Sequence, residues 1–259
     1  IRDSSTSRGL GDVYKRQKGT YALKAGVNDC SSLIGGKVYP GSIKLKANED
    51  GEYKKERLGN TVPTVSGGFG LNARWKGFDF TAFFNYSLGN KIVNATKLGS
   101  SFYSGSSKNW NINDHFTSAN RYSWIDPSTG TNLLSSASIK ANGEAWTINR
   151  LNEVNTGSSI WNPAAATVMP LVDWAVEDGS FLRVNNITIG YTLPKLFVSK
   201  LNIQNIRIYV TGYNLHCFTK YSGTDPEVDC CTSTPMTPGI DYAAYPKSRS
   251  FVGGINVTF

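Results

Sequence analysis

Residues 68–88, GFGLNARWKGFDFTAFFNYSL, contain two stretches in which apolar side chains alternate with small or polar ones. The dipeptide Lys76-Gly77 separates the stretches and suits a two-residue hairpin turn. Such a turn places Trp75 opposite Phe78, so the apolar residues of both stretches share one face of the hairpin. The segment therefore predicts an antiparallel pair of strands with one apolar face.

Two environments could accept this hairpin. In a soluble sheet the apolar face would meet a core, whereas in an outer-membrane barrel it would meet lipid and the other face would line the lumen. The alternation alone does not separate the two. Arg74 and Asp79 fall on the second face, where charges suit a watery lumen better than a packed interior.

The same alternation recurs later in the chain, before Pro194, from Ile206 onwards and in the last nine residues. We expect strands near 65–75, 78–90, 181–193, 205–218 and 249–259, joined in meander order, with residues 195–205 as a modest turn that has room for one helical turn. The apolar side chains that should share one outward face are Phe69, Leu71, Phe80, Phe84, Ile189, Ile208, Ile255 and Val257.

The connections between these strands alternate in length. They are short at Lys76-Gly77 and modest at 195–205, but long before Pro63, from 91 to 178 and from 220 to 249. One short rim and one elaborate rim are typical of outer-membrane barrels. An aromatic girdle is expected at the short rim, formed by Trp75, Phe78, Tyr191 and Phe259. The expected fold is all-β, an antiparallel transmembrane β-barrel fragment of about five strands.

The composition agrees with a β-rich protein and excludes other classes. The chain has 259 residues, with 26 Gly and 12% aromatic residues, which favours short strands and turns. No apolar run approaches the roughly 20 residues of a membrane-spanning helix. The net charge of +8 is scattered along the chain without a basic helix, so we expect no nucleic-acid binding.

Residues with catalytic or metal-binding chemistry do not form a recognisable pattern. His115 and His216 have no companion at a catalytic spacing, so we expect no enzyme activity and no cofactor. Residues 48–52 (NEDGE) lack the regular carboxylates of a calcium loop, and we expect no metal site. Cys30, Cys217, Cys230 and Cys231 suggest unpaired thiols, although Cys217 could pair with either of the last two in an oxidising compartment.

Three regions follow from this pattern. Residues 1–17, which end in DVYKRQ, resemble the translated end of a transposase adapter used in DNA library preparation, so they are excluded from the fold prediction. Residues 18–62 are Gly-rich and charged and are expected to be an extracellular loop region. Residues 63–259 are expected to be the C-terminal part of the barrel, within a longer protein.

Several motifs, taken in order, resemble the C-terminal end of SusC/RagA-type TonB-linked outer-membrane transporters. They are 177–194 (EDGSFLRVNNITIGYTLP), 206–215 (IRIYVTGYNL), 218–221 (FTKY), 225–228 (DPEV) and Tyr245-Pro246, with 40–44 (PGSIK), Gly68-Phe69 and 75–79 (WKGFD) before them. Two positions depart from the family. Residues 48–51 (NEDG) replace a commonly Asp-rich turn, which puts a metal site there in doubt, and His216-Cys217 replaces the usual apolar or Thr pair.

The resemblance implies a function for the intact protein. A family member would import a glycan or peptide, captured with a SusD-like lipoprotein lid, across the outer membrane of a Gram-negative, Bacteroidetes-like bacterium, using energy passed through TonB. It would also have an N-terminal plug and a TonB-contacting segment, which we expect to lie outside this chain. Two alternatives stay open: a TonB-dependent siderophore or vitamin receptor, and a surface adhesin or carbohydrate-binding β domain.

Large aromatic residues in the long connection are the candidates for contact with substrate or partner, because their rings can stack on sugars and fill hydrophobic pockets. The same residues could instead pack the long loop on itself, and this alternative stays open for each of them. The candidates are Trp110, Tyr122, Trp124, Trp146 and Trp161.

Overall fold

The computed structural model describes residues 14–17, 20–23, 29, 31–35, 38–43, 45, 56–102, 111–166, 171–198, 203–227, 238–242 and 245–259. The chain divides into two compact units. Residues 58–96 and 176–259 form the sheet unit, and residues 1–57 and 97–175 form the loop unit. Each unit is described by itself.

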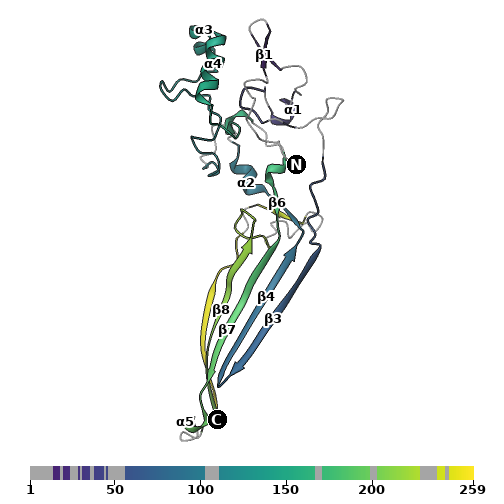
Figure 1. Cartoon of the computed structure of the whole chain (residues 1–259), viewed down its shortest axis with the longest axis vertical. Coiled ribbons are helices and arrows are strands. Elements are labelled where there is room, and N and C mark those ends of the chain that lie inside the picture. Colours follow the sequence, from purple (N-terminus) through teal and green to yellow (C-terminus); the bar gives the residue numbers. More distant parts are fainter. Residues whose placement is uncertain are drawn as a thin grey trace. The chain divides into compact units, whose positions relative to one another are not determined.

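The sheet unit contains five long antiparallel strands (Figure 1). Their spatial order is β10-β8-β7-β4-β3, which is the predicted meander order, and the predicted strands are confirmed. The strands are β3 (Val65–Trp75), β4 (Phe78–Leu88), β7 (Phe181–Thr192), β8 (Asn205–Thr219) and β10 (Ser250–Thr258).

The register of the strands confirms the predicted faces. Trp75 pairs with Phe78, which pairs in turn with Tyr191, so three aromatic residues share one row. The same row continues through Ile208 to Ile255. By the two-residue period, all eight residues expected on the common apolar face lie on it.

The hairpin turn between β3 and β4 has the expected conformation. Lys76 and Gly77 both have positive φ, 46° and 91°, as the favoured two-residue hairpin turns require. The backbone N–H of Thr192 donates to the carbonyl of Gly77 at 2.8 Å, which links the turn to β7. The end of the sheet that carries this turn is called the turn end, and the opposite end, reached by the long connections, is called the loop end.

A glycine in β7 makes room for an ion pair across two strands. The Arg207 guanidinium of β8 donates to both carboxylate oxygens of Asp79 in β4, with Nε 2.9 Å from Oδ1. Gly190 lies between them, and a Cβ there would fall 2.5 Å from the Asp79 carboxylate. A larger residue at 190 would therefore push the two charges apart.

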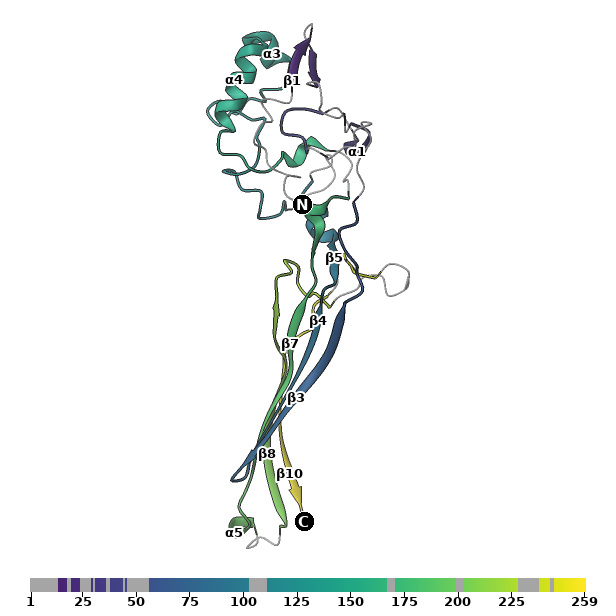
Figure 2. The ribbon, with the colours of Figure 1, turned by 45° about the vertical axis from the view of Figure 1, so that its right-hand side comes forward.

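Smaller elements complete the sheet unit. A three-stranded sheet pairs β5 (Lys91–Asn94) antiparallel with β6 (Val176–Asp178) and parallel with β9 (Ile240–Asp241). The modest turn after β7 contains one helical turn, α5 (Lys195–Val198), as expected. Figures 1 and 2 both show α5 and the C-terminus at the turn end of the sheet.

The loop unit contains short helices that the sequence did not predict. Residues 91–178 show no sustained apolar period, yet they form α2 (Ala95–Ser100), α3 (Ser136–Asn142) and α4 (Glu144–Val154). The Ser135 side chain accepts from the Ser138 N–H and caps the start of α3. Short 3-10 helices occur at Pro163–Ala165 and Asp173–Ala175, and α1 (Ser31–Ile34) lies in the first part of the chain. Such short helices are stabilised by tertiary packing. They are too short to show an apolar stripe that could be recognised in the sequence.

The described residues of the loop unit form two hydrophobic clusters. The second contains Tyr122, Leu133 and Leu151. The first contains Ile34, Ile43, Phe102, Phe116, Ile160, Trp161, Ala166 and Val172. In the part of the chain that the structure describes, none of the helices has the length and apolarity needed to cross a membrane.

The first 17 residues include a strand. β1 (Tyr14–Gln17) pairs antiparallel with β2 (Thr20–Leu23). The other residues of this segment and the side chain of Tyr14 lie outside the described part of the chain. The exclusion of residues 1–17 from the fold therefore stays a prediction, as do the proposed boundaries at 17 and 62.

Candidate functional site

The loop end of the sheet carries a buried cluster of charges centred on Arg183. Alternation along β7 places this side chain on the face opposite Leu182 and Val184, where it is only 4% exposed. Its guanidinium NH2 donates to Oδ1 of Asp225, which is equally buried. Its Nε lies 3.0 Å from Oε2 of Glu227, at ion-pair distance but without hydrogen-bond geometry.

Asp225 organises the surrounding loop. In addition to Arg183, its carboxylate accepts from the backbone N–H of Glu227 at 2.9 Å and, more weakly, from that of Lys247 at 3.4 Å. The Lys247 ammonium forms an ion pair with the Glu227 carboxylate at 2.7 Å. The cluster therefore fastens two loop segments to β7 with its charges compensated.

A second set of contacts ties the same loop to the small sheet. The Tyr221 hydroxyl donates to Asp241 of β9 at 2.6 Å, and burial, followed by this hydrogen bond, raises the pKa of Tyr221. Ser222 donates to Glu177 of β6 through both its backbone N–H and its hydroxyl, each at 2.7 Å. These contacts and the Arg183 cluster bring together motifs that lie 40 residues or more apart, including FLRV at 181–184 and DPE at 225–227.

A cavity of about 500 Å³ lies beside this cluster, a volume within the usual range for small-molecule sites. Among the described residues that line it, Glu227 is the only charged one, and it is paired with Lys247. The other lining groups are mainly hydroxyls, amides and two aromatic rings. The lining comprises Thr61, Ser66, Gly67, Asn85, Tyr86, Ser87, Asn90, Ile92, Phe181, Pro226, Glu227 and Gly239. Such a surface offers hydrogen bonds to a neutral, hydroxyl- or amide-bearing ligand.

The aromatic candidates from the sequence occupy different places. Trp161 is buried in the first core cluster, where it contacts Phe102, Phe116 and Trp174. Tyr122 is buried in the second cluster.

Trp124 is half-buried. Its Nε1 donates to the Pro40 carbonyl at 2.7 Å, and its ring meets Tyr39 edge-on. Trp146 is exposed on α4, and Trp110 lies outside the described residues. None of the four described candidates is among the residues that line the cavity. Contact of these aromatics with a ligand stays a prediction.

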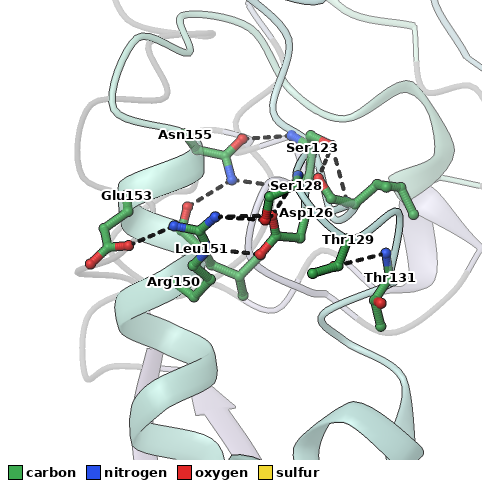
Figure 3. Close-up of polar contacts among 10 residues, drawn as sticks. Ser123, Asp126, Ser128, Thr129, Thr131, Arg150, Leu151, Glu153 and Asn155 are labelled. Atoms are coloured by element: carbon green, nitrogen blue, oxygen red, sulfur yellow. Dashed lines mark hydrogen bonds and ion pairs between the residues drawn. The ribbon is translucent and has the colours of Figure 1, made fainter.

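An ion pair that the sequence did not indicate joins α4 to the turn at 126–130 (Figure 3). Arg150 of α4 donates to both oxygens of buried Asp126, at 2.7 and 3.0 Å, and also to Glu153. The Ser128 hydroxyl donates to Asp126 at 2.6 Å. These hydrogen bonds, from Arg150 first, hold the pKa of Asp126 well below its ordinary value, and the same contact raises the pKa of Arg150. The turn 126–130 (DPSTG) was the available signal, because Asp before Pro often begins a turn.

The remaining candidate chemistry can be placed only in part. Within the described residues, no three His, Cys, Asp or Glu side chains lie close enough to hold a metal ion. Cys217 has a free thiol, whereas Cys30, Cys230, Cys231 and residues 48–52 lie outside the described chain. The candidate site of the sheet unit therefore consists of a cavity and the charge cluster that holds its loop in place.

Comparison with curated proteins gives relatives of one kind, while no protein-family model matches the chain. TonB-dependent receptor P3 of Formosa agariphila is 29% identical over 258 residues, which cover 96% of this chain and 22% of that protein. TonB-dependent receptor SusC of Bacteroides thetaiotaomicron is 34% identical over 89 residues, or 34% of this chain and 8% of that protein. Receptor P3 matches nearly the whole of this chain, and the chain thus spans about a fifth of the length of that receptor.

Solved structures agree on the fold. The RagAB peptide importer in its 'open-open' state matches with a TM-score of 0.55 and 21% identity, over 95% of this chain and 20% of that one. In the 'closed-closed' state the TM-score is 0.58 and the identity 24%, over 91% and 20% of the two chains. The five-stranded sheet of this chain is therefore built like part of that transporter's structure.

Proposed function

We propose, on the premise that this chain belongs to the SusC/RagA type of TonB-dependent receptors, that the whole protein is an energised outer-membrane importer of glycans or peptides. It would work with a SusD-like surface lipoprotein and take its energy from TonB. The relatives have the names of receptors, and we propose that this protein likewise has no enzyme activity.

The observation that carries the proposal is the exposed apolar face of the sheet. Large side chains such as Leu71, Ile189 and Ile255 are each more than half exposed, in one continuous register. A soluble protein rarely exposes so large an apolar patch, whereas the outer surface of a barrel meets lipid. This face supports a position in the outer membrane.

The loop end supports a role in substrate contact. Its cavity offers neutral hydrogen-bonding groups beside two aromatic rings, Tyr86 and Phe181, and this chemistry suits a sugar or a peptide backbone. The charge cluster of Arg183 and Asp225 would keep the loop in place without presenting an unpaired charge to the ligand. Among the four described aromatic candidates, Trp146 is the one with an exposed side chain, which favours its contact with a partner.

Uptake by cells that carry the complete gene tests the proposal. Import of the right oligosaccharide or peptide should be abolished when either TonB or the neighbouring lipoprotein gene is deleted. Uptake that persists without TonB would contradict energised import and favour a diffusion pore. Uptake of a ferric siderophore or a vitamin would favour the first alternative, and surface binding without uptake would favour an adhesin.

The loop aromatics can be tested in the same cells. Replacing Trp110 and Trp124 by Ala should lower binding of lipoprotein or ligand without unfolding the barrel, and Trp146→Ala should do so with the least structural disturbance, because its side chain is exposed. Ile125→Ala is a matched control, since Ile125 is exposed to a similar extent but has no aromatic ring. Unchanged binding in all the tryptophan variants would assign these residues to packing.

A further inference from the structure

The turn after β7 presents two large apolar side chains to solvent. In α5, Leu196 is 81% and Phe197 is 69% exposed, although the next residue, Val198, is only 2% exposed. Two adjacent apolar side chains with this exposure are unfavourable in water, because neither gains the free energy of removing its apolar surface from solvent. Their exposure needs an explanation other than the sheet's apolar face, since neither lies in a strand.

Backbone hydrogen bonds define the conformation of this turn. The N–H of Phe197 donates to the Pro194 carbonyl at 3.0 Å, and the N–H of Ile203 donates to the Val198 carbonyl at 3.3 Å. At the base of the turn, the N–H of Leu193 donates to Ile206 at 2.9 Å. The two side chains therefore project from a hydrogen-bonded turn that is anchored to β8.

The place of the turn relative to the aromatic row limits what could cover it. Trp75, Phe78 and Tyr191 form one row at the turn end, with the rings of Phe78 and Tyr191 4.5 Å apart. At about 3.3 Å per residue, Leu193 lies roughly 7 Å beyond that row, and α5 begins one residue after Pro194. Because barrel strands tilt by roughly 35–45°, this corresponds to about 5 Å along the membrane normal. If the row marks the edge of the hydrocarbon, α5 begins in the outer part of the lipid headgroup layer, which is about 5–8 Å thick on each side of the bilayer.

Positive charges accompany the apolar residues. Lys76, in the hairpin turn, has its ammonium 5.0 Å from the centre of the Trp75 ring, and Lys195 is exposed next to Leu196. Apolar side chains flanked by lysines are typical of segments that lie in the membrane interface, where the ammonium groups meet lipid phosphates.

We propose that α5 is an interfacial anchor, in which Leu196 and Phe197 insert among the phospholipid headgroups of the leaflet at the turn end while Lys76 and Lys195 face the phosphates. The anchor extends the apolar face of the sheet beyond the aromatic row. It would fix the depth of β7 and β8 in the membrane. This inference rests on the proposed outer-membrane function.

Photo-crosslinking in the intact receptor tests the anchor. A benzophenone amino acid replaces Phe197 in one variant and Leu196 in a second, and each receptor is reconstituted in nanodiscs of phosphatidylethanolamine and phosphatidylglycerol. The same amino acid is placed at two control positions that are adjacent in β10. Ile255 lies on the apolar face and Asn256 on the opposite face, and both are exposed. After irradiation, mass spectrometry identifies phospholipid adducts.

We expect lipid adducts at 197 and 196 with a yield close to that at 255, and no lipid adducts at 256. The anchor would be overturned if lipid adducts form at 255 but not at 196 and 197. Crosslinks from 196 or 197 to another part of the receptor or to a second copy would also overturn it. Either result would leave the assignment of the apolar sheet face to lipid intact. Absence of lipid adducts at 255 would overturn both the anchor and the assignment of the apolar sheet face to lipid.

Discussion

The two units of this chain place their large apolar residues in opposite ways. In the loop unit, Trp161 is 3% and Leu133 is 1% exposed, and both lie in compact clusters. In the sheet unit, Ile189 is 55% and Ile255 is 65% exposed, on a face with regular alternation. The two clusters of the loop unit bury apolar side chains against protein, whereas the apolar face of the long strands exposes them to an apolar environment.

This difference shows which contacts stabilise each unit. Removing an apolar side chain should destabilise the loop unit in water or detergent alike, because its neighbours are protein atoms. On the apolar face of the sheet, the side chains are proposed to contact lipid. Adding a charge there should therefore lower stability more than removing a methyl group. The polar contacts at the loop end should behave like a protein interior.

The largest effect is expected for Trp161→Ala in the intact receptor. Loss of a buried tryptophan should destabilise the loop unit by about 3–5 kcal/mol, because the cavity that remains is only partly refilled. Hydrogen exchange of peptides from residues 97–175 should lose protection, while peptides from β7 and β8 keep theirs. Trp146→Ala is the control and should leave exchange nearly unchanged, since that side chain is exposed. Equal effects of both variants would contradict the core assigned to Trp161.

A comparable or slightly smaller effect is expected for Arg183→Ala. Removing one partner of a buried ion pair leaves Asp225 charged and unpaired, at a cost of about 3–5 kcal/mol. Limited proteolysis should cut the loop 220–249 faster in this variant. Lys247→Ala is the control at the exposed edge of the cluster and should cost about 0–1 kcal/mol. A proteolysis rate like that of the unaltered receptor would contradict the fastening role of Arg183.

The apolar face of the sheet can be tested with a charge. Leu71→Arg should cost about 2–4 kcal/mol if the residue lies near the bilayer midplane. Asn72→Arg, on the neighbouring position of the opposite face, should cost much less. Urea unfolding of the receptor in lipid vesicles measures both. A greater loss for Asn72→Arg would mean that the faces are reversed with respect to lipid.

The smallest effect is a pH dependence of the loop unit. The pKa of Asp126 is depressed in the folded state, so the unfolded chain binds the proton first as the pH falls. The stabilisation is complete above the ordinary Asp value of about 4, and it decreases as the pH falls below that value towards the depressed folded pKa. The protection of residues 123–155 against hydrogen exchange, measured relative to the intrinsic exchange rate at each pH, should decrease over this range. Asp126→Asn should flatten the dependence, and an unchanged slope would exclude Asp126 as its source.

Local patterns were sufficient to predict the sheet. The alternation in residues 68–88 and the Lys76-Gly77 turn determine which residues pair and which face each side chain takes, because both depend on neighbours a few positions away. The outward row through Trp75, Phe78 and Tyr191 follows from the same rule. The motif series likewise predicts the kind of relative that the comparisons give, because the motifs and their order are properties of the amino-acid sequence alone.

The loop end and the loop unit depended on the tertiary structure. Arg183 meets Asp225 across 42 positions, and Arg150 meets Asp126 across 24, separations at which no local period links the partners. The helices α3 and α4 are too short to show an apolar stripe, and the burial of Trp161 depends on residues as distant as Ile34. The sequence by itself determined the strands, their faces and the register of the β3–β4 hairpin, because these follow from a two-residue period and a two-residue turn. Only the tertiary structure decided which loop aromatics are buried and which charges pair, because long-range packing sets both.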